Sequence, residues 1–106
     1  MFKVEEMAFE LIEVSQPLIR RIRVRDKALA DQLSRAASSI ALNISESNYS
    51  DPGNRRARLF TAAGSANETR SVLRVAVASR YFTVDDAQAS RELLDNIVPI
   101  LWKLTH

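Results

Sequence analysis

The spacing of the apolar residues is the feature that most constrains the fold of this chain. Apolar side chains recur at intervals of three and four in four segments, at about 4–24, 27–47 and 55–78 and from Thr83 to near the C-terminus. This spacing is typical of α-helices with one buried face, and the strict alternation of strands is rare here. The pattern therefore predicts an all-α protein.

Residues that end helices separate these segments. Asp26 precedes the second segment and is predicted to be its N-cap. The run 48–54 is the strongest helix breaker in the chain, and either Asp51 or Asn54 is predicted to cap the third helix. Thr83 is the predicted N-cap of the fourth helix. Because such short connections make consecutive helices antiparallel neighbours, we expect an antiparallel up-down-up-down four-helix bundle.

We expect residues 1–106 to form a single domain with one core. A proline or glycine within a predicted helix interrupts the regular helical pattern at three positions. Pro17 predicts a kink in the first helix, which we expect to remain one helix because its apolar stripe keeps phase. Pro99 leaves open whether the last turns bend or begin a new helix. Gly64 costs about 1 kcal/mol relative to alanine, so we expect a close helix contact there.

Composition excludes most catalytic chemistry. The chain has no cysteine, which rules out disulfides and cysteine-based zinc or redox sites. His106 is the only histidine, so neither a Ser-His or Cys-His pair nor the Glu-x-x-His motifs of bundle di-iron sites can be built. We therefore predict a protein that is not an enzyme, with no catalytic residues, cofactor or metal site.

The N-terminal segment argues against export. Glutamates interrupt its apolar residues at Glu5, Glu6, Glu10 and Glu13, whereas a signal peptide needs an unbroken apolar stretch. No apolar run approaches the ~20 residues that span a bilayer. We expect a cytoplasmic protein without a membrane partner.

Two segments carry a specific resemblance. The first runs from Ala30 to Glu46 and reads ADQLSRAASSIALNISE; the second comprises Phe60 and the residues AGSANE from Ala63 to Glu68. Together they resemble the bacterial four-helix bundle family that includes the proteins encoded in ribosomal RNA intervening sequences and the accessory variability determinant of diversity-generating retroelements. The resemblance covers roughly residues 5 to 104. The chain departs from the family after Glu46, where a Gly/Arg-rich turn is usual.

The resemblance implies a four-helix bundle that assembles into a homo-oligomeric ring, typically a pentamer. The retroelement member of the family is a basic ring that binds nucleic acid and a reverse transcriptase. By this resemblance the expected partners are further copies of the chain, with RNA or DNA and a reverse transcriptase as additional candidates.

The two matched segments contain five polar residues that are candidates for function. They either line a binding pocket or form hydrogen bonds between helices or subunits, and we favour the second interpretation because buried polar groups need partners. Arg35 is expected to pair with a carboxylate in the same network. The five residues are Arg35, Asn43, Glu46, Asn67 and Glu68.

Twelve of the fifteen basic residues are arginine, and many of them form two clusters. One cluster ends the first helix, where the helix dipole favours cations; the other begins the third helix, where the dipole disfavours them. The second cluster therefore suggests a partner, either phosphate or the acidic face at 5–13 of a neighbouring subunit. The clusters are Arg20, Arg21, Arg23 and Arg25, and Arg55, Arg56 and Arg58.

Two functional hypotheses follow. In the first, an oligomeric, non-enzymatic scaffold binds nucleic acid through its arginine clusters in an accessory role. In the alternative, the protein is a structural or protein-interaction module whose arginines make subunit contacts. Its interface would then use apolar residues expected to be exposed, namely Phe2, Phe9, Tyr81, Phe82 and Trp102.

Overall fold

The computed structural model describes residues 2–106, with side chains from Lys3 onward. Within the described residues it contains four helices and no strand. The prediction of an all-α protein is confirmed. The helices are α1 (Phe2–Arg25), α2 (Lys27–Ser47), α3 (Pro52–Ala78) and α4 (Gln88–Thr105).

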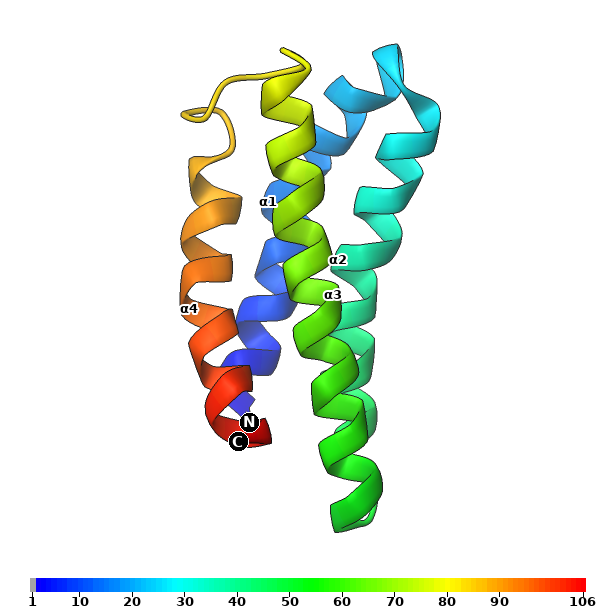
Figure 1. The fold of residues 1–106 in the computed structure, drawn as a ribbon, viewed down its shortest axis with the longest axis vertical. Helices are drawn as coiled ribbons and strands as arrows, with labels where there is room; N and C mark the ends of the chain where they lie inside the picture. The colour runs from blue at the N-terminus through cyan, green and yellow to red at the C-terminus, as the bar shows by residue number, and fades with distance from the viewer. Residues whose placement is uncertain (1) are drawn as a thin grey trace.

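Consecutive helices run in opposite directions along an elongated bundle of 42 × 22 × 20 Å (Figure 1). Helix α2 packs against α1 and α3, and α4 packs against α3 and α1, so each helix has two neighbours in the bundle. Helices α2 and α3 share the most extensive contact, because α4 is only 18 residues long and leaves the start of α3 uncovered. The up-down-up-down arrangement expected from the short connections is therefore present.

The core lies along the bundle axis and receives large apolar side chains from every helix. Each contributes roughly 1.5–3 kcal/mol on burial. The nine largest of those that are fully buried are Leu11, Ile22, Leu33, Ile40, Ile44, Leu73, Leu94, Ile97 and Leu101. Polar groups in the core are paired: the buried Ser15 and Ser90 hydroxyls of α1 and α4 are 2.8 Å apart. Within the described chain, every buried side-chain nitrogen or oxygen has a hydrogen-bond partner.

The caps of α2 and α3 are those that the sequence predicts. The Asp26 carboxylate accepts the Leu29 N–H at 3.0 Å, and Asp51 accepts the Asn54 N–H at the same distance. Asp51 rather than Asn54 is the cap of α3. The helix therefore begins at Pro52, three residues before the expected Arg55, because proline suits the first helical position. The hydrogen bonds from Asn54 hold the pKa of Asp51 below its ordinary value.

The predicted cap of the fourth helix is wrong. Thr83 and Asp86 exchange backbone-to-side-chain hydrogen bonds at 2.9 and 3.1 Å, but the turn they cap is held by i to i+3 bonds at Ala87 and Gln88. Helix α4 begins only at Gln88, and its N-cap Ala87 makes no side-chain bond. A capping box predicts that a helical turn starts, but it does not ensure that the same turn continues as the α-helix.

The three predicted irregularities have different outcomes. Helix α1 continues through Pro17 as one helix, as the phase of its stripe predicts, and α4 also continues through Pro99 rather than starting again. Among the described residues, nothing makes the close contact expected at Gly64. Gly64 is exposed, and a Cβ at this position would meet no atom within 4 Å.

Arg80, two residues after the end of α3, has an unusual backbone conformation. Its φ is +64°, in the left-handed region that usually favours glycine. Two hydrogen bonds surround it, from the Arg80 N–H to the Val77 carbonyl and from the Tyr81 N–H to the Ala76 carbonyl. This is the Schellman arrangement, in which the left-handed residue satisfies the last carbonyls of the helix.

We predict that Arg80→Gly raises the free energy of unfolding by about 1 kcal/mol, because glycine avoids the roughly 1–2 kcal/mol steric cost of left-handed backbone. Urea denaturation followed by circular dichroism measures the change. The matched control is Arg80→Ala, which removes the guanidinium but keeps the Cβ and should give no comparable gain. An equal gain in both variants would contradict the explanation.

Candidate functional site: arginine clusters and the outer face of α2 and α3

The two arginine clusters lie at opposite ends of the bundle. The first, at the end of α1, is at the same end as the start of α2 and the connection between α3 and α4 (Figure 1). The second, at the start of α3, is at the other end, where the connection from α2 protrudes beyond the N- and C-termini (Figure 1). The clusters therefore do not form one surface on a single chain.

Half of the first cluster is paired with acids. Arg21 lies 3.0 Å from the Asp86 carboxylate, and Arg23 lies 2.6 Å from Asp31. The hydrogen bond from Arg23 lowers the pKa of Asp31; the pKa of Asp86 is also lowered, first by the Thr83 hydrogen bonds and then by Arg21.

Two arginines of this cluster have no acidic partner. Among the described residues, no carboxylate oxygen lies within 4 Å of Arg20 or Arg25. Both side chains are exposed, and the Arg25 guanidinium lies 6.0 Å from the centroid of the Tyr81 ring. Within this cluster, these two cations are the ones that the fold leaves available to an anionic partner.

Two arginines of the second cluster donate hydrogen bonds to the C-terminal ends of neighbouring helices. Arg55 Nε donates to the Ser47 carbonyl at 3.2 Å, and Arg56 donates two hydrogen bonds to the Thr105 carbonyl at 3.2 and 2.9 Å. Ser47 and Thr105 are the last residues of α2 and α4, where the helix dipole is negative. The cations therefore complement the neighbouring helices, which explains why they occur at the unfavourable end of their own helix. Arg58 is exposed and makes no hydrogen bond or ion pair with the described residues.

The five polar residues of the matched segments divide into two groups. Asn43 donates to the Ser39 carbonyl and hydroxyl at 2.9 and 3.0 Å, and the Ser39 hydroxyl lies 2.7 Å from that of Ser65 on α3. Glu68 accepts a longer bond of 3.4 Å from Gln32 of α2. Asn43 and Glu68 thus belong to polar contacts that join α2 to α3.

The other three point away from the chain. Arg35, Glu46 and Asn67 are exposed. Within the described residues, no carboxylate lies within 4 Å of Arg35, so the predicted pairing does not occur inside one chain.

A stripe of small and polar residues on α3 was missed by the sequence reasoning. Exposed residues recur along it at spacings of three and four, beside exposed residues of α2 at spacings of three, seven and four. We call this surface the outer α2–α3 face. It comprises Gln32, Arg35, Leu42 and Glu46 of α2 and Thr61, Gly64, Glu68, Ser71 and Val75 of α3. The signal was present in the sequence, since Gly64 in mid-helix already marked the stripe.

The exposed apolar residues predicted to form an interface do not gather on one surface. Phe9 on α1 and Trp102 near the end of α4 are exposed, whereas Tyr81 and Phe82 lie in the connection at the other end. The expectation for Phe82 is wrong: only 4 % of it is exposed, because its ring packs into the core. The side chain of Phe2 lies outside the described residues.

The described residues contain no group of three or more side chains that could hold a metal ion. His106 stacks on Trp102, with 3.4 Å between the ring centroids, at the exposed C-terminal end. None of the helices in the described part of the chain combines the length and apolar character needed to cross a bilayer.

Comparison with known proteins gives one family and a related structure. The model of the 23S rRNA-intervening sequence protein family matches residues 2–103. The fold is similar to the crystal structure of a protein of unknown function from the S23 ribosomal protein family of Bacteroides thetaiotaomicron. The TM-score is 0.87 and the identity 21 %, over 96 % of this chain and 97 % of that one. No curated protein matches the sequence.

We predict that Arg56→Ala lowers the free energy of unfolding by about 1 kcal/mol, because it removes both hydrogen bonds to the Thr105 carbonyl at the end of α4. Arg58→Ala is the matched control, since Arg58 lies on the same helix without such a bond, and its effect should stay within about 0.5 kcal/mol. Urea titrations of both variants provide the comparison, and equal losses would show that the carbonyl contact contributes nothing.

Proposed function

Because the chain belongs to the 23S rRNA-intervening sequence protein family, we propose that it is a non-enzymatic, homo-oligomeric scaffold that contacts nucleic acid in an accessory role. The observation that carries this proposal is the outer α2–α3 face. The matched segments supply several of its members, and two of these, Arg35 and Glu46, are exposed and form no side-chain hydrogen bond or ion pair with the described residues. A glycine in mid-helix costs about 1 kcal/mol relative to alanine, and Gly64 has no internal contact that offsets this cost.

A second copy of the chain suits this face. Small side chains at Thr61, Gly64 and Ser71 permit a close approach of another helix, and the exposed Leu42 offers apolar area for burial. Arg35, Glu46 and Glu68 provide both signs of charge on the same face, so it can complement another protein surface. We propose that subunits assemble through it, and the family resemblance favours a ring of five.

We predict that the wild-type protein has the solution mass of about five 11.9 kDa subunits by multi-angle light scattering, and that Gly64→Leu abolishes this assembly. The variant should fold, because a side chain at this position meets nothing within 4 Å in the chain. Ala89→Leu is the control, a small-to-large change at an exposed position of α4. A monomeric wild type would refute assembly, and an unchanged mass of Gly64→Leu would refute this face.

The arginines left without partners support a contact with nucleic acid. Arg20 and Arg25 are exposed and lack an acidic partner within the described chain, and assembly would repeat them in every subunit. Repetition converts weak phosphate contacts into useful affinity. Arg55 and Arg56 are less suited to this role, since each already donates to a helix-end carbonyl. We therefore assign the nucleic-acid contact to the end of α1.

We predict that the wild-type oligomer binds a labelled single-stranded RNA with an affinity that falls steeply with salt, and that Arg20→Ser/Arg25→Ser weakens binding and reduces the salt slope. Fluorescence anisotropy at several salt concentrations gives both quantities, and a DNA of the same sequence tests the preference for RNA. Lys103→Ser, which removes an exposed cation of α4, is the control.

The alternative function is a structural or protein-interaction module. It is favoured by the internal use of four arginines of the two clusters, of which two bind helix-end carbonyls and two pair with aspartates. The anisotropy experiment separates the two functions: an intact oligomer that shows no retention of RNA or DNA at low salt would leave only the interaction module.

A further inference from the structure

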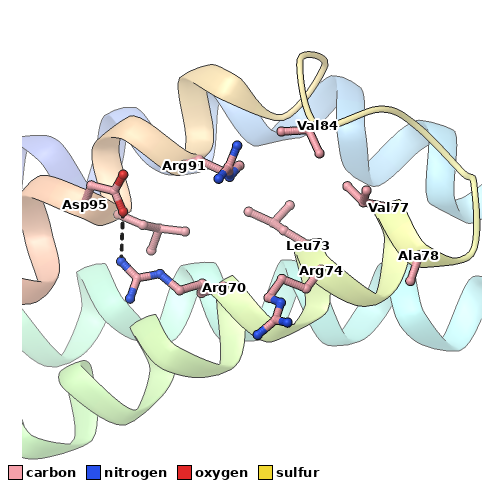
Figure 2. Close-up of a pocket in the computed structure, with 9 residues that line it drawn as sticks. Arg70, Leu73, Arg74, Val77, Ala78, Val84, Arg91 and Asp95 are labelled. Carbon is pink, nitrogen blue, oxygen red and sulfur yellow. Dashed lines mark hydrogen bonds and ion pairs between the residues drawn. The ribbon is translucent and has the colours of Figure 1, made fainter.

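A pocket of about 360 Å³ opens between the second half of α3 and the first half of α4, beside the connection between them (Figure 2). None of the residues that line it belongs to the outer α2–α3 face. Its volume falls in the range of small-molecule sites. Neither the family resemblance nor the proposed scaffold function assigns a role to this pocket.

The floor and one wall of the pocket are apolar. Leu73 of α3 and Leu94 of α4 are buried at its base, and Val77 is half-buried beside them. Val84, in the connection, lines the same opening and is 47 % exposed (Figure 2). An apolar group of a ligand could pack against these side chains and so be removed from water, which is favourable.

The rim is strongly cationic. Arg70, Arg74 and Arg91 line the pocket together with one acid, Asp95. Asp95 is already engaged, because its carboxylate lies 3.0 Å from the Arg70 guanidinium (Figure 2). Within the described chain, no carboxylate oxygen comes within 4 Å of Arg74 or Arg91. Two guanidinium groups on opposite helices therefore border an apolar pocket without a counter-charge.

We propose that this pocket binds a small organic anion with an apolar body, such as a carboxylate, sulfonate or phosphate monoester that carries an aliphatic or aromatic group. Arg74 and Arg91 hold the anionic group, since guanidinium forks suit such oxygens, and Leu73, Leu94 and Val84 contact the body. An inorganic anion would leave the apolar floor unused, and a neutral apolar molecule would leave the two cations uncompensated.

The probe is 8-anilinonaphthalene-1-sulfonate, which joins a sulfonate to an apolar aromatic body, titrated into the full chain at low salt and followed by fluorescence. We expect saturable binding at one site per chain. Methyl resonances of Leu73, Val77, Val84 and Leu94 should shift in nuclear magnetic resonance spectra. The neutral dye N-phenyl-1-naphthylamine should bind more weakly, and octanoate should displace the sulfonate dye whereas inorganic phosphate should not.

The decisive variant is Arg74→Gln/Arg91→Gln, which should weaken binding of the sulfonate dye about tenfold or more and leave binding of the neutral dye unchanged. The control Arg20→Gln/Arg25→Gln removes the same charge elsewhere and should keep the affinity for the dye. This control removes the arginines assigned to RNA binding and leaves the pocket intact. A loss of RNA binding and a loss of dye binding can therefore be told apart. Val84→Trp, at an exposed position, should obstruct the pocket and abolish binding of both dyes.

Three results would overturn the proposal. The first is an absence of saturable dye binding to the folded oligomer, as expected if another copy covers the pocket. The second is an equal loss of affinity for the sulfonate dye in the two double arginine variants, which would indicate a general effect of net charge. The third is displacement of the dye by inorganic phosphate alone, which would mean that the site recognises the anion without its apolar body.

Discussion

Burial of one apolar stripe from each helix is the constraint on which the rest of the structure depends. The nine largest fully buried side chains come from all four helices, and they can meet on one axis only if the short connections reverse the chain each time. This arrangement decides which helix ends are neighbours. It also brings Ser15 of α1 against Ser90 of α4, so that two hydroxyls satisfy each other within the core.

The antiparallel arrangement also decides the role of many arginines. Considered on α3 alone, Arg55 and Arg56 occupy the wrong end of a helix dipole. In the bundle they donate to the last carbonyls of α2 and α4, where a cation is favourable. At the opposite end Arg21 and Arg23 are paired with aspartates. Among the described residues, the arginines without an acid or a carbonyl partner include Arg20 and Arg25 at the end of α1 and Arg74 and Arg91 at the pocket between α3 and α4, while Arg35, Arg58 and Arg80 lie elsewhere.

The residues of the two matched segments show that the fold of one chain does not explain all of its sequence. Asn43 and Glu68 contribute to polar contacts between α2 and α3. Among the described residues, the side chains of Arg35 and Glu46 form no hydrogen bond or ion pair, and Gly64 carries the stability cost of a glycine in mid-helix although a Cβ there would meet no atom within 4 Å. This contrast is the reason for proposing that the outer α2–α3 face contacts another subunit.

The sequence by itself determined the four helices, the continuity of α1 through Pro17 and the caps at Asp26 and Asp51. These features depend on contacts between residues a few positions apart, which periodicity and capping chemistry describe directly. Only the tertiary structure decided the burial of Phe82, the carbonyl partners of Arg55 and Arg56, the separate turn at Thr83 and the charged pocket. Except for the turn at Thr83, which is held by local bonds, these features depend on how segments separated along the chain pack together. Arg56 and Thr105, for example, are 49 positions apart, and such contacts leave no local pattern in the sequence.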